Sequence, residues 1–216
     1  NTIFNNLISG DIIPEGFNMD VGPFVVDSLH SQLSESLTVP SSNADNSAKL
    51  WIGYSSLNEL WFYAEVLDDD LNFAPSSVTV PGSEMWGYDS IEIGFGAYDV
   101  RDFNGGNLLG SSPHTDAEED RTNAPDYQFR FGLWGTPDAI EETGATHVGF
   151  GINGEQQSGA TRGDLLKDDD GNVIGYKMLA LYDLTALGVG DGILTPPGAD
   201  EVVLVPFNIA LNDNDV

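Results

Sequence analysis

The chain contains 216 residues, of which 35 are acidic and 7 are basic, so its formal net charge at pH 7 is −28. No basic stripe exists to neutralise phosphates, which argues against nucleic acid and anionic membrane surfaces as partners. Cysteine is absent, which excludes disulfides, thiolate metal sites and cysteine nucleophiles. Apolar residues make up 40% of the chain, enough for a folded domain despite the charge.

The acid excess is typical of a surface in salty or calcium-rich fluid, where counterions screen the repulsion among carboxylates. No apolar run reaches the roughly 20 residues that a membrane span requires, so we expect no membrane insertion. We therefore predict an extracellular or cell-surface location, or a periplasmic one, in a prokaryote. An acidic domain excised from a more balanced parent chain is the alternative.

Short segments rich in β-branched and aromatic residues, separated by Gly and Pro, predict an all-β fold. Eight strands are expected, and they cover residues 23–27, 48–54, 59–67, 88–97, 127–134, 147–152, 173–181 and 202–211. Such strands predict an antiparallel β-sandwich of jelly-roll or immunoglobulin-like topology, with few short helical turns. The sandwich forms one domain, residues 23–216, and residues 1–22 are an N-terminal extension or a first edge strand.

Alternation along the strands predicts which side chains face the core. The expected core residues are Ile91, Ile93, Phe95, Phe129, Phe131, Leu179, Leu181, Phe207 and Ile209. Residues 168–172 read DDDGN between two apolar pairs, which predicts a hairpin turn with Asp-Gly supplying positive φ. Residues 183–187 predict a short helical turn, and residues 101–126 predict a long loop.

Four segments resemble a known family. They are residues 60–69 (LWFYAEVLDD), 86–95 (WGYDSIEIGF), 175–188 (GYKMLALYDLTALG) and 205–215 (VPFNIALNDND). In this order they resemble the family 9 carbohydrate-binding modules and their broader DOMON-like relatives, from about residue 22 to the chain end. The resemblance implies a non-catalytic β-sandwich whose concave sheet binds polysaccharide or oligosaccharide.

The same resemblance implies the sugar-binding residues. Trp86 takes the position of the stacking aromatic, Glu92 that of the hydroxyl-binding acid, and Gln128 and Arg130 those of a polar strand pair. Strand parity independently places Trp86 and Glu92 on the face opposite Ile91. The structural alternative is that Trp86 caps a strand end and that Glu92 forms a surface salt bridge with Arg130.

The family continues beyond its Asn-Asp-x-Asp segment into a strand that delivers a second aromatic, whereas this sequence ends at Val216. A longer parent enzyme chain or a neighbouring subunit would supply that strand at the C-terminal edge, or sugar recognition is lost. Trp134, which shares parity with Gln128 and Arg130, is the candidate replacement within the chain.

Oxygen-rich clusters suggest calcium, a hard cation that takes carboxylate and carbonyl ligands. The candidates are residues 68–70, 168–172 and 212–215, and none has EF-hand spacing. The resembling modules bind structural calcium near two of these segments, which favours Asp68, Asp69 and Asp213 as ligands. A plain turn is the favoured interpretation of residues 168–172.

No catalytic pattern stands out, because the three His residues lack metal-ligand spacing and Gly-x-Ser-x-Gly is missing. Two alternative functions remain open. The first is a structural or interaction module of a cell-surface or fibre assembly, and the second is a DOMON-like electron-transfer domain. The latter would bind haem b through Met85, Lys177 or Met178 as the available ligand types.

Overall fold

The computed structural model describes residues 23–27, 41–55, 59–75, 87–96, 126–138, 140, 146–150, 159–183 and 207–213. Within these residues the chain forms nine strands: β1 (Phe24–Val26), β2 (Asn46–Ser55), β3 (Glu59–Asp68), β4 (Ser90–Gly96), β5 (Asp126–Trp134), β6 (Thr146–Phe150), β7 (Gly159–Lys167), β8 (Val173–Asp183) and β9 (Phe207–Asn212). The expected all-β fold is confirmed. No helix among the described residues is long and apolar enough to cross a membrane.

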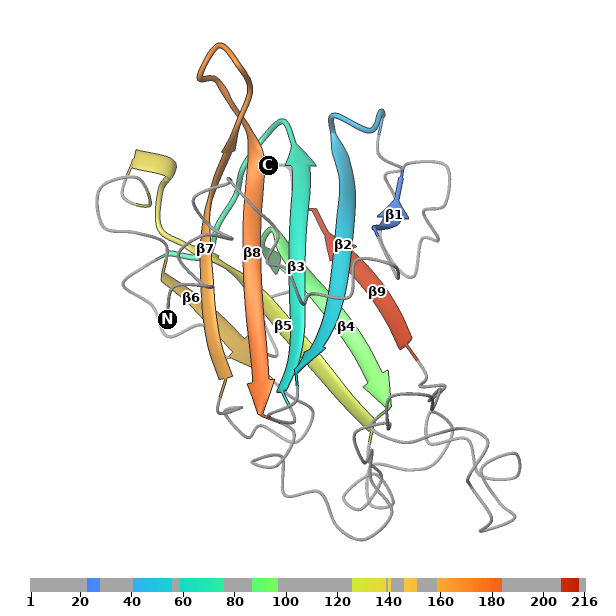
Figure 1. The fold of residues 1–216 in the computed structure, drawn as a ribbon. Helices are drawn as coiled ribbons and strands as arrows, with labels where there is room; N and C mark the ends of the chain where they lie inside the picture. Colours follow the sequence, from blue (N-terminus) through green and yellow to red (C-terminus); the bar gives the residue numbers. More distant parts are fainter. Residues whose placement is uncertain are drawn as a thin grey trace, which may run out of the picture.

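The strands form two antiparallel sheets. The five-stranded sheet has the order β1-β2-β3-β8-β7, and the four-stranded sheet has the order β6-β5-β4-β9. Figure 1 shows the five-stranded sheet in front, with the strands of the other sheet passing behind it at a steep diagonal. The chain crosses from one sheet to the other three times, between β3 and β4, between β6 and β7, and between β8 and β9.

All eight expected strands are present with shifted ends, and one strand, β7, was not expected. Its first six residues read GATRGD and carry no apolar alternation, so periodicity gives no signal there. It forms because β8 offers a long hydrogen-bonding edge, to which residues from Gly159 onward pair in register. The expected turn of residues 168–172 joins these two strands and is confirmed: the Asp168 carboxylate accepts the N–H groups of Asp170 and Asn172 at 3.0 and 2.8 Å.

One apolar core lies between the sheets, because it contains residues from both. Phe62, Val66 and Tyr176 come from the five-stranded sheet, whereas Ile91 and Phe131 come from the four-stranded one. Ile91, Ile93 and Phe131 are fully buried as expected, and Phe207 and Ile209 are partly buried against them. The side chains of Phe95, Phe129 and Leu181 lie outside the described residues, as do residues 184–187 of the expected helical turn.

Leu179 is fully buried, as expected, but on the face of the five-stranded sheet that points away from the core between the sheets. Tyr176, Met178 and Ala180 face the core from β8, so the alternating side-chain direction turns Leu179 to the opposite face of the sheet. There it pairs in register with Tyr63, which in turn pairs with Trp51. The two rings are 5.4 Å apart, and all three side chains are buried. The outward face of the five-stranded sheet therefore carries an apolar row of its own.

Gly175 marks a close approach between β8 and β3. Its φ is +148°, and a Cβ atom added there would lie 1.9 Å from the Val66 carbonyl oxygen. Gly171 in the adjacent turn also has positive φ, +85°, but open space surrounds it. Comparing substitutions at the two glycines therefore distinguishes the effect of steric crowding from that of backbone strain.

We predict that Gly175→Ala lowers the free energy of unfolding by at least about 2 kcal/mol, because backbone strain and overpacking act together. Gly171→Ala is the matched control and should cost only about 1 kcal/mol, the strain of positive φ alone. Urea denaturation of both variants measures the difference. Equal losses would contradict the close approach between the strands.

Candidate functional site

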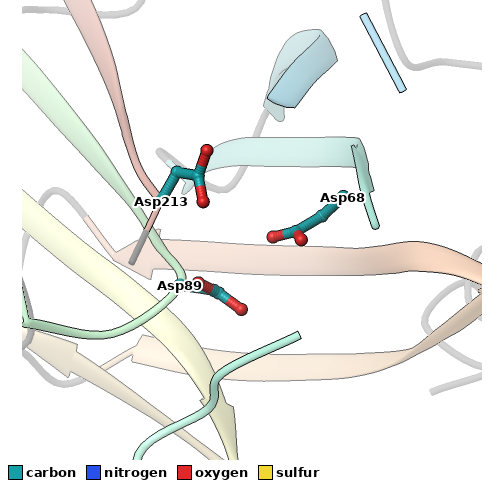
Figure 2. Close-up of side chains that lie close together, drawn as sticks. All are labelled: Asp68, Asp89 and Asp213. Carbon is teal, nitrogen blue, oxygen red and sulfur yellow. The ribbon is translucent and has the colours of Figure 1, made fainter. Parts of the chain in front are cut away.

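Three aspartates from three separate strand ends lie together at one end of the core. Asp68 is the last residue of β3, Asp89 directly precedes β4, and Asp213 directly follows β9. Figure 2 shows their carboxyl groups converging on one space. One carboxylate oxygen from each residue lies within 4.8 Å of the other two. We call this group the aspartate triad.

The aspartate triad is poorly solvated. Asp68 is 3% exposed, Asp89 is fully buried, and Asp213 is half-buried. Carboxylates at this separation repel one another, and the repulsion grows when water is excluded. The arrangement therefore concentrates negative charge where little solvent screens it.

Local hydrogen bonds fix two members of the triad. The Asp68 carboxylate accepts the N–H of Asp70 at 3.1 Å, which shapes the chain as it leaves β3. Asn72 and Asp89 are joined twice: the Asp89 N–H donates to the Asn72 carbonyl oxygen at 3.0 Å, and the Asn72 N–H donates to the Asp89 carboxylate. These bonds tie the segment after β3 to the start of β4.

Tyr176 lies against the triad from within the core, where it also makes an edge-on contact with Phe73 at 5.4 Å. Burial raises the pKa of the Tyr176 phenol well above its ordinary value, and the negative charges of Asp89, Asp68 and Asp213 raise it further. The Tyr176 phenol is therefore neutral at pH 7.

Three carboxylates on separate strands provide hard oxygen ligands, the donor set that Ca²⁺ and Mg²⁺ prefer. Two of the expected ligands, Asp68 and Asp213, belong to the triad. Asp69 is exposed and lies outside it. The third member, Asp89, was missed because the expected strand of residues 88–97 placed it inside the strand, whereas β4 begins at Ser90; the available signal was that Asp89 shares the core-facing parity of Ile91.

A second group of polar side chains lies on the outward face of the four-stranded sheet. Arg130 Nε is 2.5 Å from Glu92 Oε1, and the two residues are cross-strand partners, so the salt bridge expected under the structural alternative is present. Asn212 Nδ2 donates to Ser90 Oγ at 3.0 Å and to Glu92 Oε1 at 3.2 Å. Ser90, Glu92, Arg130 and Asn212 form what we call the polar face.

The polar face is mostly buried and has small neighbours within the sheet. The side chains of Arg130 and Glu92 are 22% and 14% exposed, respectively, and Ser90 is fully buried. In the register, Ala210 lies beside Glu92, Gly132 beside Ser90, and Gly94 two residues along β4. These residues project little or no side chain, so the Glu92–Arg130 pair has no large side chain beside it at these positions.

The other expected sugar-binding residues are Gln128, Trp86 and Trp134, and the structure describes the side chain of Trp134 alone. Gln128 pairs in register with Gly94, one step along β5 from Arg130, but its side chain lies outside the described residues, as does all of Trp86. Trp134 is only 9% exposed and packs against Ala74 and Tyr88. Its ring is therefore packed at the end of β5 and does not present an open stacking surface.

Candidate haem ligands within the described residues lie on opposite sides of β8. Met178 is fully buried in the apolar core, whereas its neighbour Lys177 is half-buried on the other face. Met85 lies outside the described residues.

The fold and these two groups of side chains define an all-β protein with a buried acidic cluster and an outward polar face. No protein-family model, curated protein or solved structure matches the chain. The function is therefore argued from the residues themselves.

We predict a measurable coupling energy between Glu92 and Arg130, because their short contact is only partly exposed. A double-mutant cycle with Glu92→Gln and Arg130→Met should give about 0.5–1.5 kcal/mol, above most exposed ion pairs. Urea unfolding of the four proteins measures it. A coupling indistinguishable from zero would mean that the two side chains do not hold each other in solution.

Proposed function

We propose that the chain is a non-catalytic carbohydrate-binding module of an extracellular prokaryotic protein, and that its ligand is a polysaccharide or oligosaccharide. The observation that carries this proposal is the polar face, where Glu92, Arg130 and Asn212 are joined on the outward side of the four-stranded sheet. Two of these residues are those that the family resemblance implies.

The chemistry of the polar face suits sugar hydroxyls. A hydroxyl group both donates and accepts, and the face offers carboxylate acceptors beside guanidinium and amide donors. Glu92 and Arg130 together carry no net charge, so a neutral ligand meets no uncompensated charge there. Trp86 directly precedes Gly87 at the approach to β4, and we assign it the stacking role by its place in the sequence motif.

We further propose that the aspartate triad binds a structural calcium ion. The ion would supply positive charge among three crowded carboxylates, and Asp68, Asp89 and Asp213 would each contribute oxygen. Since these residues terminate strands of both sheets, a shared ion would hold β3, β4 and β9 together at that end.

An interaction module of a larger assembly is the second candidate. The observation that favours it is the position of β9, which has β4 as a neighbour on one side and forms the edge of the four-stranded sheet among the described strands. An edge strand offers backbone groups to a strand from another chain or from a longer parent chain. This function predicts binding to protein and none to sugars.

We expect the wild-type chain to bind neutral oligosaccharides, and Arg130→Met and Trp86→Ala to bind more weakly, each losing about 1–3 kcal/mol of binding free energy. Lys49→Met, an exposed change in β2 of the other sheet, should leave affinity unchanged. Calorimetry against gluco- and xylo-oligosaccharides measures this. Absence of binding to every sugar tested would favour the interaction module, and a Soret absorbance band in the purified protein would favour the haem-binding function.

We expect millimolar calcium, at constant ionic strength, to raise the thermal unfolding midpoint relative to chelator. The corresponding gain in the free energy of unfolding is about 2.7 kcal/mol when the calcium concentration is 100 times its dissociation constant. Asp213→Asn should abolish the response and raise the midpoint in chelator, because one repelling charge is gone. Asp69→Asn changes the exposed neighbour outside the triad and should keep the response to calcium. A midpoint that follows ionic strength alone, whichever cation is present, would contradict a calcium site.

A further inference from the structure

Asn212 holds the polar face together from the end of β9. Its side-chain nitrogen reaches two oxygens of β4, Ser90 Oγ at 3.0 Å and Glu92 Oε1 at 3.2 Å. Asn212 and Ser90 are cross-strand partners in the register, so the first contact lies straight across the ladder, and the second reaches diagonally to the next outward residue. The resemblance to carbohydrate-binding modules gave Asn212 no role in the site.

The contact to Glu92 matters because of the oxygen it uses. Arg130 approaches Glu92 Oε1 from β5, and Asn212 approaches the same atom from β9. The terminal torsion of a glutamate is broad and is not fixed by the side chain's own rotamer preference. An ion pair from β5 and a hydrogen bond from β9 together restrict that rotation, and so they set the plane in which the carboxylate meets a ligand.

We propose that Asn212 is a positioning residue that orients the Glu92 carboxylate for ligand binding; this inference rests on the proposed carbohydrate-binding function. An amide suits the task because it donates a hydrogen bond without adding charge. A carboxylate in its place would face Glu92 at about the same distance and repel it, which would turn the acceptor away from its binding orientation.

The test compares the same substitution at two outward positions of β9. Asn212→Asp should weaken oligosaccharide binding on the order of tenfold at pH 7, the loss typical of removing a hydrogen bond to a charged group. Asn208→Asp adds the same charge to an exposed residue opposite Gly94, on the other side of Ala210 from Asn212, and should leave affinity within about twofold. Calorimetry with the oligosaccharide that binds the wild-type chain gives both values.

Two uncharged substitutions separate positioning from an effect of added charge. Asn212→Ala removes the donor and should also weaken binding on the order of tenfold. Asn212→Gln keeps the amide donor and should bind more tightly than Asn212→Ala. Circular dichroism confirms that each variant is folded before binding is compared.

The possible outcomes distinguish the two proposals. A wild-type chain that binds no oligosaccharide contradicts the carbohydrate-binding function, and the positioning role falls with it. If the wild-type chain binds and Asn212→Ala binds equally well, the function stands and the positioning role is overturned. A loss in Asn212→Asp that Asn208→Asp matches would assign the effect to charge on the sheet and would also overturn it.

Discussion

The space that Asp68, Asp89 and Asp213 share imposes the strongest electrostatic constraint on this fold. Each carboxylate continues the core-facing side of its strand: Asp68 stands two residues after Val66, and Asp89 stands two residues before Ile91. The alternation that points Val66 and Ile91 into the core therefore also points Asp68 and Asp89 to the same side, at the end of the core. Like charges in a poorly solvated space raise the free energy of the folded state, and a shared divalent cation is the counter-charge that we propose.

The start of β4 and the end of β9 also carry two residues of the polar face, because neighbouring residues in a strand point to opposite sides of the sheet. Ser90 follows Asp89 and Asn212 precedes Asp213, so adjacent residues point to opposite sides of the four-stranded sheet. The hydrogen bond from Asn212 to Ser90 thus lies directly behind the aspartate triad. Any displacement of the ends of β4 and β9 would change both the spacing of the carboxylates and the contact that orients Glu92.

Periodicity in the sequence was sufficient to predict the all-β fold and the outward position of Glu92, because both follow from local alternation. It did not predict β7, whose pairing depends on the edge that β8 provides, and it predicted the burial of Leu179 without the face on which Leu179 lies beside Tyr63. Asp89 was missed for a related reason. Clusters of acids along the sequence drew attention to Asp69, whereas the triad is assembled from three strand ends that only the tertiary fold brings together.

The two outward faces of the molecule differ in a way that bears on function. Across the five-stranded sheet, Trp51, Tyr63 and Leu179 form a buried apolar row that needs no soluble ligand. Across the four-stranded sheet, the corresponding positions hold a charged pair and an amide among glycines and alanine. A partly exposed ion pair contributes little to stability, and small residues in strands weaken packing, so stability alone does not account for this face. Recognition of a polar ligand, the function that we propose, would account for it, because such a ligand requires donors and acceptors held in fixed positions.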